Sequence, residues 1–168
     1  MDLLVSLLLN AKEQYSEGLS IASHCYQAAQ LAKRQGARKA VVLSALFHDC
    51  GHLFAHDDTN GCGAAAHAEV GARVLRLFGL DADICELVRH HANAKRYLAS
   101  IEKNYLDRLS EASRITLVAQ GGCMAPDEIA EFEQHPLFRE ILALRRFDDA
   151  AKNTNAPEPT RAQLLALL

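Results

Sequence analysis

The spacing of apolar residues along this chain indicates helices almost throughout. Apolar side chains recur every three or four residues rather than every second residue, which is the period of a helix with one buried face. Segments with the alternation typical of strands are nearly absent. The pattern therefore predicts an all-α protein, a compact bundle of helices that carries polar residues in its interior.

Glycine, proline and helix-capping residues divide this periodic pattern into separate helices. Residues 55–63, rich in Asp, Asn and Gly, are typical of a loop. The expected helices are residues 1–14, a segment from Ile21 that Gly36 ends, a segment from Ala40 that ends near Gly51, residues 64–78, residues 81–92, a segment from Ser110 that stops at Gly121, one that begins at Pro126, and residues 138–149.

The chain has 168 residues, a length that suits one domain with one core. No internal repeat, low-complexity tract or shift in composition suggests a boundary. We therefore expect a single domain over residues 1–168. Within it, residues 153–168 are expected to form a C-terminal linker or lid followed by a short helix from Thr160.

Composition and charge exclude several classes of partner. The net charge is −3 without a basic cluster, so we expect no nucleic-acid binding. No apolar run approaches the roughly 20 residues that span a bilayer, and the apolar N-terminus lacks the features of a signal peptide. The five cysteines form no C-x-x-C pair and are typical of reduced thiols, so a cytoplasmic protein is expected. The oligomeric state is left open.

The adjacent residues His48 and Asp49 are the first sign of a chemical function. They follow the apolar run of residues 41–47 at the end of an expected helix. Burying an imidazole and a carboxylate there costs free energy unless both are hydrogen-bonded or bind a metal. Because consecutive helical residues point about 100° apart, His48 can bind one metal while Asp49 reaches a second or bridges two.

Four further residues complete a pattern of metal ligands, and each lies within or beside an apolar stretch of another expected helix. A single histidine of this kind is more often structural, but an ordered set of imidazoles and carboxylates on several helices is typical of a dinuclear site inside a bundle. Such mixed ligands suit iron, manganese or zinc better than calcium or magnesium. The predicted ligands are His24, His48, Asp49, His67, His91 and Asp148.

These residues resemble a known family. The order His24…His48-Asp49…Asp148 resembles the HD-domain superfamily, which is named for its metal-binding His-Asp doublet and consists mainly of phosphohydrolases. The additional pair His67 and His91 resembles its mixed-valent di-iron branch, to which myo-inositol oxygenase also belongs. The A-K-R-Y segment 94–97 and the Q-G-G segment 120–122 resemble, more specifically, the HD-domain oxygenases of phosphonate degradation. The similarity covers nearly the whole chain, residues 15–152.

The resemblance implies a role for each matching residue. One iron would take His24, His48 and Asp148, a second would take His67 and His91, and Asp49 would bridge this Fe(II)/Fe(III) pair. His52 matches a catalytic histidine that contacts the substrate. The residues that match substrate-binding groups are Lys95, Ser113, Thr116 and Arg145 around the phosphonate, Gln120 in the same wall, and Tyr15 and Glu17 in a mobile pair at the substrate's amino end.

Without the resemblance, some of these residues have plainer interpretations. Lys95 and Arg96 are then more typical of a solvated charge pair, and Ser113 of a residue near a helix start. The chain also departs from the family pattern where Ser23 stands in place of an acidic residue before the first ligand.

The expected function is that of a di-iron oxygenase that uses O2 to cleave the C–P bond of a small 1-hydroxyphosphonate, releasing phosphate and a carboxylic acid. Glu17 is the only matched residue that offers negative charge to the far end of the substrate. The expected substrate is therefore 2-amino-1-hydroxyethylphosphonate, which would yield glycine, or its N-methylated analogue. Two alternatives remain: a metal-dependent HD phosphohydrolase acting on a phosphate ester or nucleotide, and a catalytically silent metal-stabilised binding module.

Overall fold

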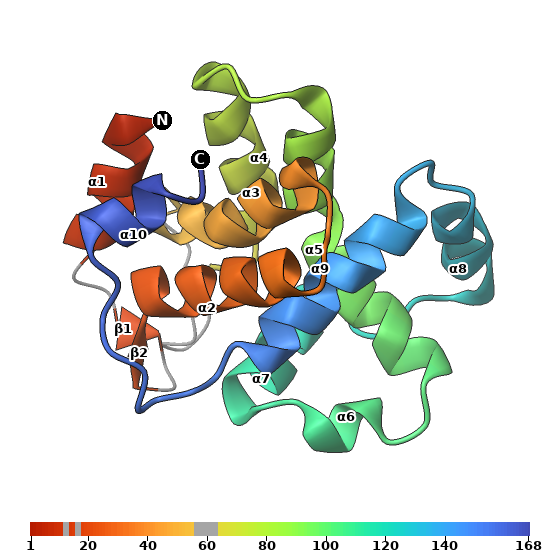
Figure 1. Cartoon of the computed structure of the whole chain (residues 1–168). Helices are drawn as coiled ribbons and strands as arrows, with labels where there is room; N and C mark the ends of the chain where they lie inside the picture. Colours follow the sequence, from red (N-terminus) through yellow and green to blue (C-terminus); the bar gives the residue numbers. More distant parts are fainter. Residues whose placement is uncertain (12–13, 16–17, 56–63) are drawn as a thin grey trace.

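The computed structural model describes residues 1–11, 14–15, 18–55 and 64–168, and its helices confirm the all-α prediction (Figure 1). The elements in chain order are α1 (Asp2–Asn10), β1 (Gln14–Tyr15), β2 (Leu19–Ser20), α2 (Ile21–Arg34), α3 (Lys39–Phe47), the 3-10 helix η1 (Cys50–Leu53), α4 (His67–Leu77), α5 (Ala82–Ile101), α6 (Tyr105–Arg108), α7 (Glu111–Ala119), α8 (Pro126–Glu133), α9 (Phe138–Ala150) and α10 (Arg161–Leu165).

Helices α2, α3, α5 and α9 form the centre of the bundle. Helix α5 packs against α3, α4 and α9, while α2 packs against α3 and α9. The C-terminal helix α10 lies beside α1, so both ends of the chain are on the same side of the molecule (Figure 1). The centre is filled by fully buried apolar side chains, among them Leu46, Phe47, Leu87, Ile141 and Leu144.

Three helix predictions were wrong at their ends. The expected helix from Ala40 ends at Phe47 and not near Gly51, because the backbone leaves the α-helical conformation at Asp49 and η1 follows. The expected helix 81–92 continues to Ile101, because Ala94, Tyr97 and Leu98 extend its buried face beyond residue 92. The expected helix 1–14 stops at Asn10, and residues 14–15 instead pair antiparallel with residues 19–20. Gly18, at φ +78°, supplies the left-handed backbone conformation between these strands. The short helix α6 was not expected.

Several expected helix ends are confirmed by their hydrogen bonds. The Ser110 hydroxyl accepts from the backbone N–H of Ser113 at 3.2 Å, which begins α7 where the sequence predicted it. Pro126 occupies the first turn of α8. Thr160 caps α10 in a reciprocal pair with Gln163. The apolar side chain of Leu164 then packs α10 into the core.

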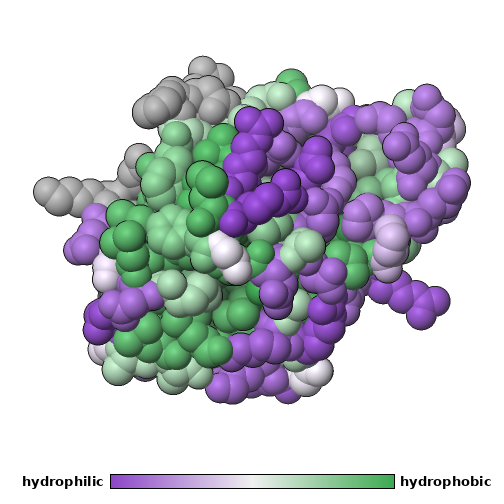
Figure 2. Space-filling model, turned by 90° about the horizontal axis from the view of Figure 1, so that it is seen from above, coloured by the Kyte–Doolittle hydropathy of each residue, from purple (hydrophilic) through white to green (hydrophobic). Residues whose placement is uncertain are grey.

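The surface is divided in character. Apolar side chains gather on the side where α1 and α10 lie, and hydrophilic side chains cover the side of α8 (Figure 2). Within the described ranges, no helix combines the length and the apolarity that crossing a membrane requires. The cysteines in these ranges are free thiols: Cys25, Cys50, Cys85 and Cys123.

Candidate metal centre and substrate pocket

Four of the predicted ligands, all histidines, meet in the interior of the bundle. They come from α2, from the end of α3, from the start of α4 and from the middle of α5. His24 and His48 approach each other to 3.1 Å between their Nε2 atoms, and His67 and His91 approach to 3.0 Å in the same way. All four rings are buried. The bundle therefore brings the histidines together as two facing pairs.

The outer nitrogen of each ring, Nδ1, faces a backbone carbonyl oxygen. A carbonyl can only accept, so each Nδ1 carries the ring proton and donates it. The inner Nε2 of each neutral ring then presents a lone pair, the arrangement typical of histidines that bind metals. The Nδ1–oxygen distances are 2.9 Å from His24 to Ala151, 2.9 Å from His48 to Ala45, 2.6 Å from His67 to Ala64 and 2.6 Å from His91 to Val88.

The segment 48–52 turns sharply enough to place its residues beside both histidine pairs. His48 ends α3, and Asp49 occupies the turn before η1. Gly51 lies directly on the start of α4, where a Cβ atom would come within 1.9 Å of the carbonyl oxygen of His67. Only glycine permits this contact, which brings η1 and the His67 side chain to the same side of the centre.

Asp49 lies between the two histidine pairs. Its Oδ2 is 3.3 Å from His48 Nε2 and 3.6 Å from His24 Nε2. Its Oδ1 is 3.5 Å from His67 Nε2 and 3.7 Å from His91 Nε2. The buried Oδ2 has no hydrogen-bond partner among the described residues. One carboxylate oxygen thus faces each pair, which is the geometry of a bridging ligand.

Asp148, on α9, adds a second carboxylate to one pair only. Its Oδ1 is 3.1 Å from His24 Nε2 and 3.7 Å from His48 Nε2. Its Oδ2 accepts a hydrogen bond of 2.7 Å from Arg145 Nη1. The six predicted ligands therefore separate into one group with Asp148 and another without it, joined by Asp49.

The protonation of the buried histidines favours a bound cation. Burial lowers the pKa of His48, but Asp49, Cys25 and Asp148 together outweigh it and hold that pKa well above its usual value. In the other pair, burial and the neighbouring His52 hold the pKa of His67 well below its usual value, while burial and His48 lower the pKa of His91 to about 4. His67 and His91 thus stay neutral at pH 7, and their Nε2 lone pairs face each other across 3.0 Å. A metal ion between them removes this repulsion, so the donor set fits a metal.

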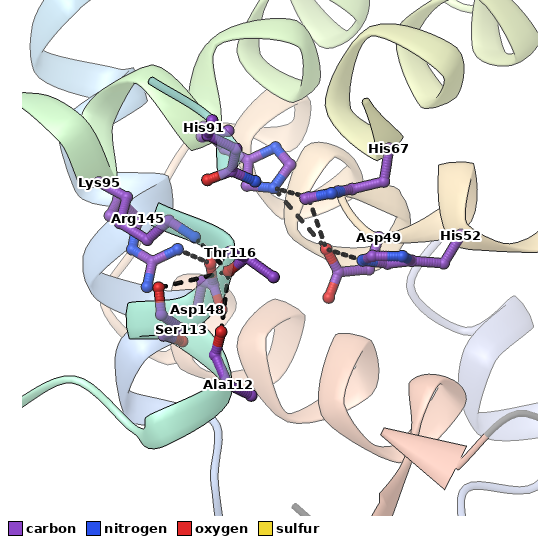
Figure 3. Close-up of a pocket in the computed structure, with 12 residues that line it drawn as sticks. Asp49, His52, His67, His91, Lys95, Ala112, Ser113, Thr116, Arg145 and Asp148 are labelled. Atoms are coloured by element: carbon purple, nitrogen blue, oxygen red, sulfur yellow. Dashed lines mark hydrogen bonds and ion pairs between the residues drawn. The ribbon is translucent and has the colours of Figure 1, made fainter. Parts of the chain in front are cut away.

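A polar pocket opens beside the histidine cluster, between the segment of Asp49 and His52 and the helices α5, α7 and α9 (Figure 3). The buried Lys95 donates to the hydroxyl of Thr116 at 2.8 Å. Burial and then the charge of Arg145 lower the pKa of Lys95 to about 7. Most of the predicted substrate residues line this pocket: His52, Lys95, Ser113, Thr116, Gln120 and Arg145.

Two lining residues point to a bound ligand. Both amide atoms of Gln120 are buried and lack a hydrogen-bond partner among the described residues. His52 is held differently from the four inner histidines, because its Nδ1 accepts from the backbone N–H of Ala64 at 3.2 Å. The proton of a neutral His52 therefore lies on Nε2, which is 3.9 Å from Asp49 Oδ1. His52 thus offers a donor rather than a lone pair, as suits a residue that contacts substrate.

The comparisons with known proteins agree with this site. The family model of the HD domain matches residues 21–120. The chain belongs to the HD-domain family.

Two relatives of this HD-domain protein are named as phosphonate dioxygenases. The [1-hydroxy-2-(trimethylamino)ethyl]phosphonate dioxygenase (glycine-betaine-forming) of Leisingera caerulea is 38% identical over 88% of this chain and 76% of its own length. The hydroxymethylphosphonate dioxygenase of Gimesia maris is 42% identical over 82% of this chain and 70% of its own length. An uncharacterized protein of Acanthamoeba polyphaga mimivirus is 36% identical over 88% of this chain and 72% of its own length. The resemblance to HD-domain oxygenases of phosphonate degradation is thereby confirmed.

Two of the predicted substrate residues of this HD-domain chain are not placed in the pocket. Glu17 lies outside the described residues, and of Tyr15 only the backbone, in β1, is described.

The alternative of a solvated Lys95–Arg96 pair is wrong, because Lys95 is 3% exposed. Arg96 instead bonds Glu128 and the carbonyl of Gly122, which anchors the Q-G-G loop. Sequence reasoning missed Tyr105 and Asp149, which both contact Arg145.

Proposed function

We propose that this HD-domain protein is a di-iron oxygenase that uses O2 to cleave the C–P bond of a small 1-hydroxyphosphonate, and that it works in the cytoplasm. Two relatives named as phosphonate dioxygenases support the reaction class. The observation that carries the proposal is the approach of His67 and His91 to Asp49 Oδ1, at 3.5 Å and 3.7 Å. These residues offer a second metal position, which a mononuclear phosphohydrolase does not need.

In this proposal the two metals are an Fe(II)/Fe(III) pair. Asp49 would be a ligand to both, because one of its oxygens faces each histidine pair. When bound, the irons supply the activation of dioxygen and the oxidising capacity that the reaction requires. His24, His48 and Asp148 would hold the first iron, and His67 and His91 would hold the second.

The pocket residues bind and orient the phosphonate. A phosphonate dianion is matched by the cations Lys95 and Arg145 and by the hydroxyls of Ser113 and Thr116. Because Lys95 is buried and its pKa is about 7, the arriving dianion favours its charged form. A bound phosphonate offers hydrogen-bond partners to the Gln120 amide, whose atoms have none among the described residues.

The substrate's C1 hydroxyl is expected at the metal side of the pocket, near His52. The Nε2–H of His52 can donate to a substrate oxygen placed beside Asp49, and the stacking of His52 on His67, with ring centroids 4.1 Å apart, fixes its direction. Overall, R–CH(OH)–PO3²⁻ and O2 give R–COO⁻, HPO4²⁻ and H⁺. The carbon is oxidised, dioxygen is reduced, and the bond between C1 and phosphorus breaks.

The direct test is the oxygen dependence of phosphate release from a 1-hydroxyphosphonate. Iron-replete protein purified under low oxygen should show a coupled Fe(II)/Fe(III) electron paramagnetic resonance signal, and it should release phosphate only when O2 is admitted. Phosphate monoesters should not be hydrolysed. Equal phosphate release under strict anaerobiosis would instead identify a phosphohydrolase.

We further propose that the substrate carries an ammonium or methylated ammonium group next to C1, as in 2-amino-1-hydroxyethylphosphonate. The family resemblance matches the Glu17 carboxylate to that end of the substrate. Glu17→Ala should weaken the preference for the amino substrate by about 1.5–3 kcal/mol, the worth of a hydrogen bond to a charged group. Turnover of hydroxymethylphosphonate serves as the control and should change much less. Equal losses on both substrates would make Glu17 a structural residue.

A further inference from the structure

Arg145 is held from outside the pocket by two residues, Tyr105 and Asp149. Its Nε donates to the Tyr105 hydroxyl at 3.1 Å, and its Nη2 pairs with Asp149 Oδ1. The Tyr105 hydroxyl in turn donates to Asp149 Oδ2 at 2.6 Å. The three side chains therefore form a closed ring of hydrogen bonds, in which the Tyr105 oxygen accepts one bond and donates another.

This ring determines which N–H groups of Arg145 remain for a ligand. A guanidinium has five N–H donors in one plane. The bonds to Tyr105 and Asp149 use one each, and the bond from Nη1 to Asp148 Oδ2, at 2.7 Å, uses a third. One N–H then remains on each terminal nitrogen. Arg145 lines the pocket together with Lys95 and Ser113, so these donors belong to the phosphonate side of the site.

Asp148 and Asp149 are neighbours in the sequence but have different environments. Consecutive helical residues point about 100° apart. Asp148 is buried and faces His24, whereas Asp149 is 23% exposed and bonds Tyr105 instead. Burial lowers the pKa of Arg145, but Asp148 and then Asp149 outweigh it and hold that pKa well above its usual value. The guanidinium therefore stays charged, and Asp149 holds one end of it away from Asp148.

We propose that Asp149 and Tyr105 are positioning residues that fix Arg145 for the phosphonate group. This inference rests on the proposed function, in which Arg145 binds the substrate's anionic end. Without Asp149, the Arg145 side chain is free to turn both terminal nitrogens toward Asp148, which removes donors from the pocket. The Tyr105 ring also contacts Arg108 and Arg146, whose guanidinium carbons lie 5.7 Å and 5.8 Å from its centroid.

The test measures binding of inorganic phosphate to the iron-loaded protein by calorimetry, together with kcat and KM for hydroxymethylphosphonate. Asp149→Asn should weaken phosphate binding and raise KM by about tenfold, the usual effect of losing one charge-assisted hydrogen bond, with a smaller change in kcat. Tyr105→Phe should weaken binding by about threefold, because Asp149 still holds Arg145. The iron content and Tm of both variants should match those of the control Asp107→Asn, which removes an exposed carboxylate from α6.

A double mutant separates positioning from a general structural effect. If Asp149 acts through Arg145, then Asp149→Asn should change phosphate binding by less than about twofold in an Arg145→Lys background. Unchanged phosphate affinity in Asp149→Asn, or a loss of equal size in both backgrounds, would overturn the inference. Should Asp149→Asn not fold, Tyr105→Phe decides, since it removes a single hydroxyl.

The proposed function and this inference can fail separately. Wild-type protein that binds phosphate with this mutational pattern but never consumes O2 with a hydroxyphosphonate would refute the oxygenase and leave the positioning role intact. Normal oxygenase activity with no effect of Asp149→Asn on KM or on phosphate binding would refute the positioning role and leave the oxygenase intact.

Discussion

Among the residues that the structure describes, two clusters bring ligand atoms of histidines and carboxylates within 4.8 Å of one another. They differ in a property that these distances do not show. One is the buried central cluster around Asp49. The other is a partly exposed cluster, which we call the surface cluster, formed by Glu86 and His90 of α5 and His135 before α9. In the surface cluster the His90 and His135 rings lie 4.7 Å apart.

The two clusters differ in the group that faces the outer nitrogen of each histidine. In the central cluster every Nδ1 faces a carbonyl oxygen, so the Nε2 of each neutral ring carries a lone pair. In the surface cluster the Nδ1 of His135 accepts from the backbone N–H of Leu137 at 3.1 Å. A neutral His135 must therefore carry its proton on Nε2 and has no lone pair there. The backbone partner, more than the distance between side chains, distinguishes the candidate ligands of the central cluster from the surface cluster.

The largest effect is expected from the carboxylates of the two clusters. Asp49→Ala should lose both irons and all oxygenase activity, because each of its oxygens faces one metal position. The control Glu86→Ala removes the surface cluster's carboxylate and should retain both irons. Iron is counted by mass spectrometry after iron-replete expression. Retention of one iron in Asp49→Ala would show that Asp49 does not bridge.

A smaller effect is expected from single histidines. His67→Ala should empty the second position and keep the first, whose ligands lie on the other side of Asp49. The matched variant His135→Ala should leave iron content and activity unchanged. Iron content and activity are measured here too. A loss of iron in His135→Ala would place a third metal at the surface cluster and contradict the inference that a neutral His135 carries its proton on Nε2.

Burial gives the central region a further property: whether Lys95 is charged depends on whether a ligand is bound. The pKa of Lys95 is lowered to about 7, so at pH 8 most of the free protein carries a neutral Lys95. A bound phosphonate stabilises the charged form, and binding at pH 8 should take up close to one proton. Affinity should accordingly fall as the pH rises above about 7.

Calorimetry in buffers of different ionisation enthalpy measures this proton uptake, with inorganic phosphate as the ligand. Lys95→Met should bind phosphate more weakly and lose the extra uptake. Equal uptake by Lys95→Met and wild type would assign the proton to the ligand or to another residue.

The smallest effect concerns the contact between Glu86 and His90 in the surface cluster. The Glu86 Oε2 and His90 Nε2 atoms lie 3.4 Å apart, both side chains are partly exposed, and burial lowers the pKa of His90, which disfavours its charged form. Glu86→Gln should change the free energy of unfolding by less than about 0.5 kcal/mol. Chemical denaturation measures this change. A loss of several kcal/mol would show that the surface cluster contributes to the core in a way that its exposure does not suggest.

Much of the fold, and the clustering of the candidate ligands, could be predicted from the sequence because both follow from short-range patterns. The helix starts at Ser110 and Pro126 were correct, since local backbone chemistry sets them. The predicted ligands meet in the structure because each lies among apolar neighbours that must be buried. The length of α5 could also have been predicted, since Tyr97 and Leu98 continue the helical period.

Other features depend on contacts that residue type does not encode. A strand of two residues, such as Gln14–Tyr15, has no detectable period. The carbonyl groups that set each ring proton are backbone atoms and are contributed by residues with no chemistry of their own, such as Ala45 and Ala151. The roles of Tyr105 and Asp149 arise only when α6 and α9 meet, across 44 positions of the chain.

The contact between His24 and Asp148 joins side chains 124 positions apart, whereas His67 and His91 are separated by only 24. During synthesis on the ribosome, α4 and α5 are complete and able to meet long before α9 exists. The entropic cost of closing a loop also grows with its length, which favours the shorter closure. The half of the centre that contains His67 and His91 is therefore expected to assemble first, and the half that contains Asp148 closes only when the last long helix docks. The order of metal loading is thus linked to the direction in which the chain is made.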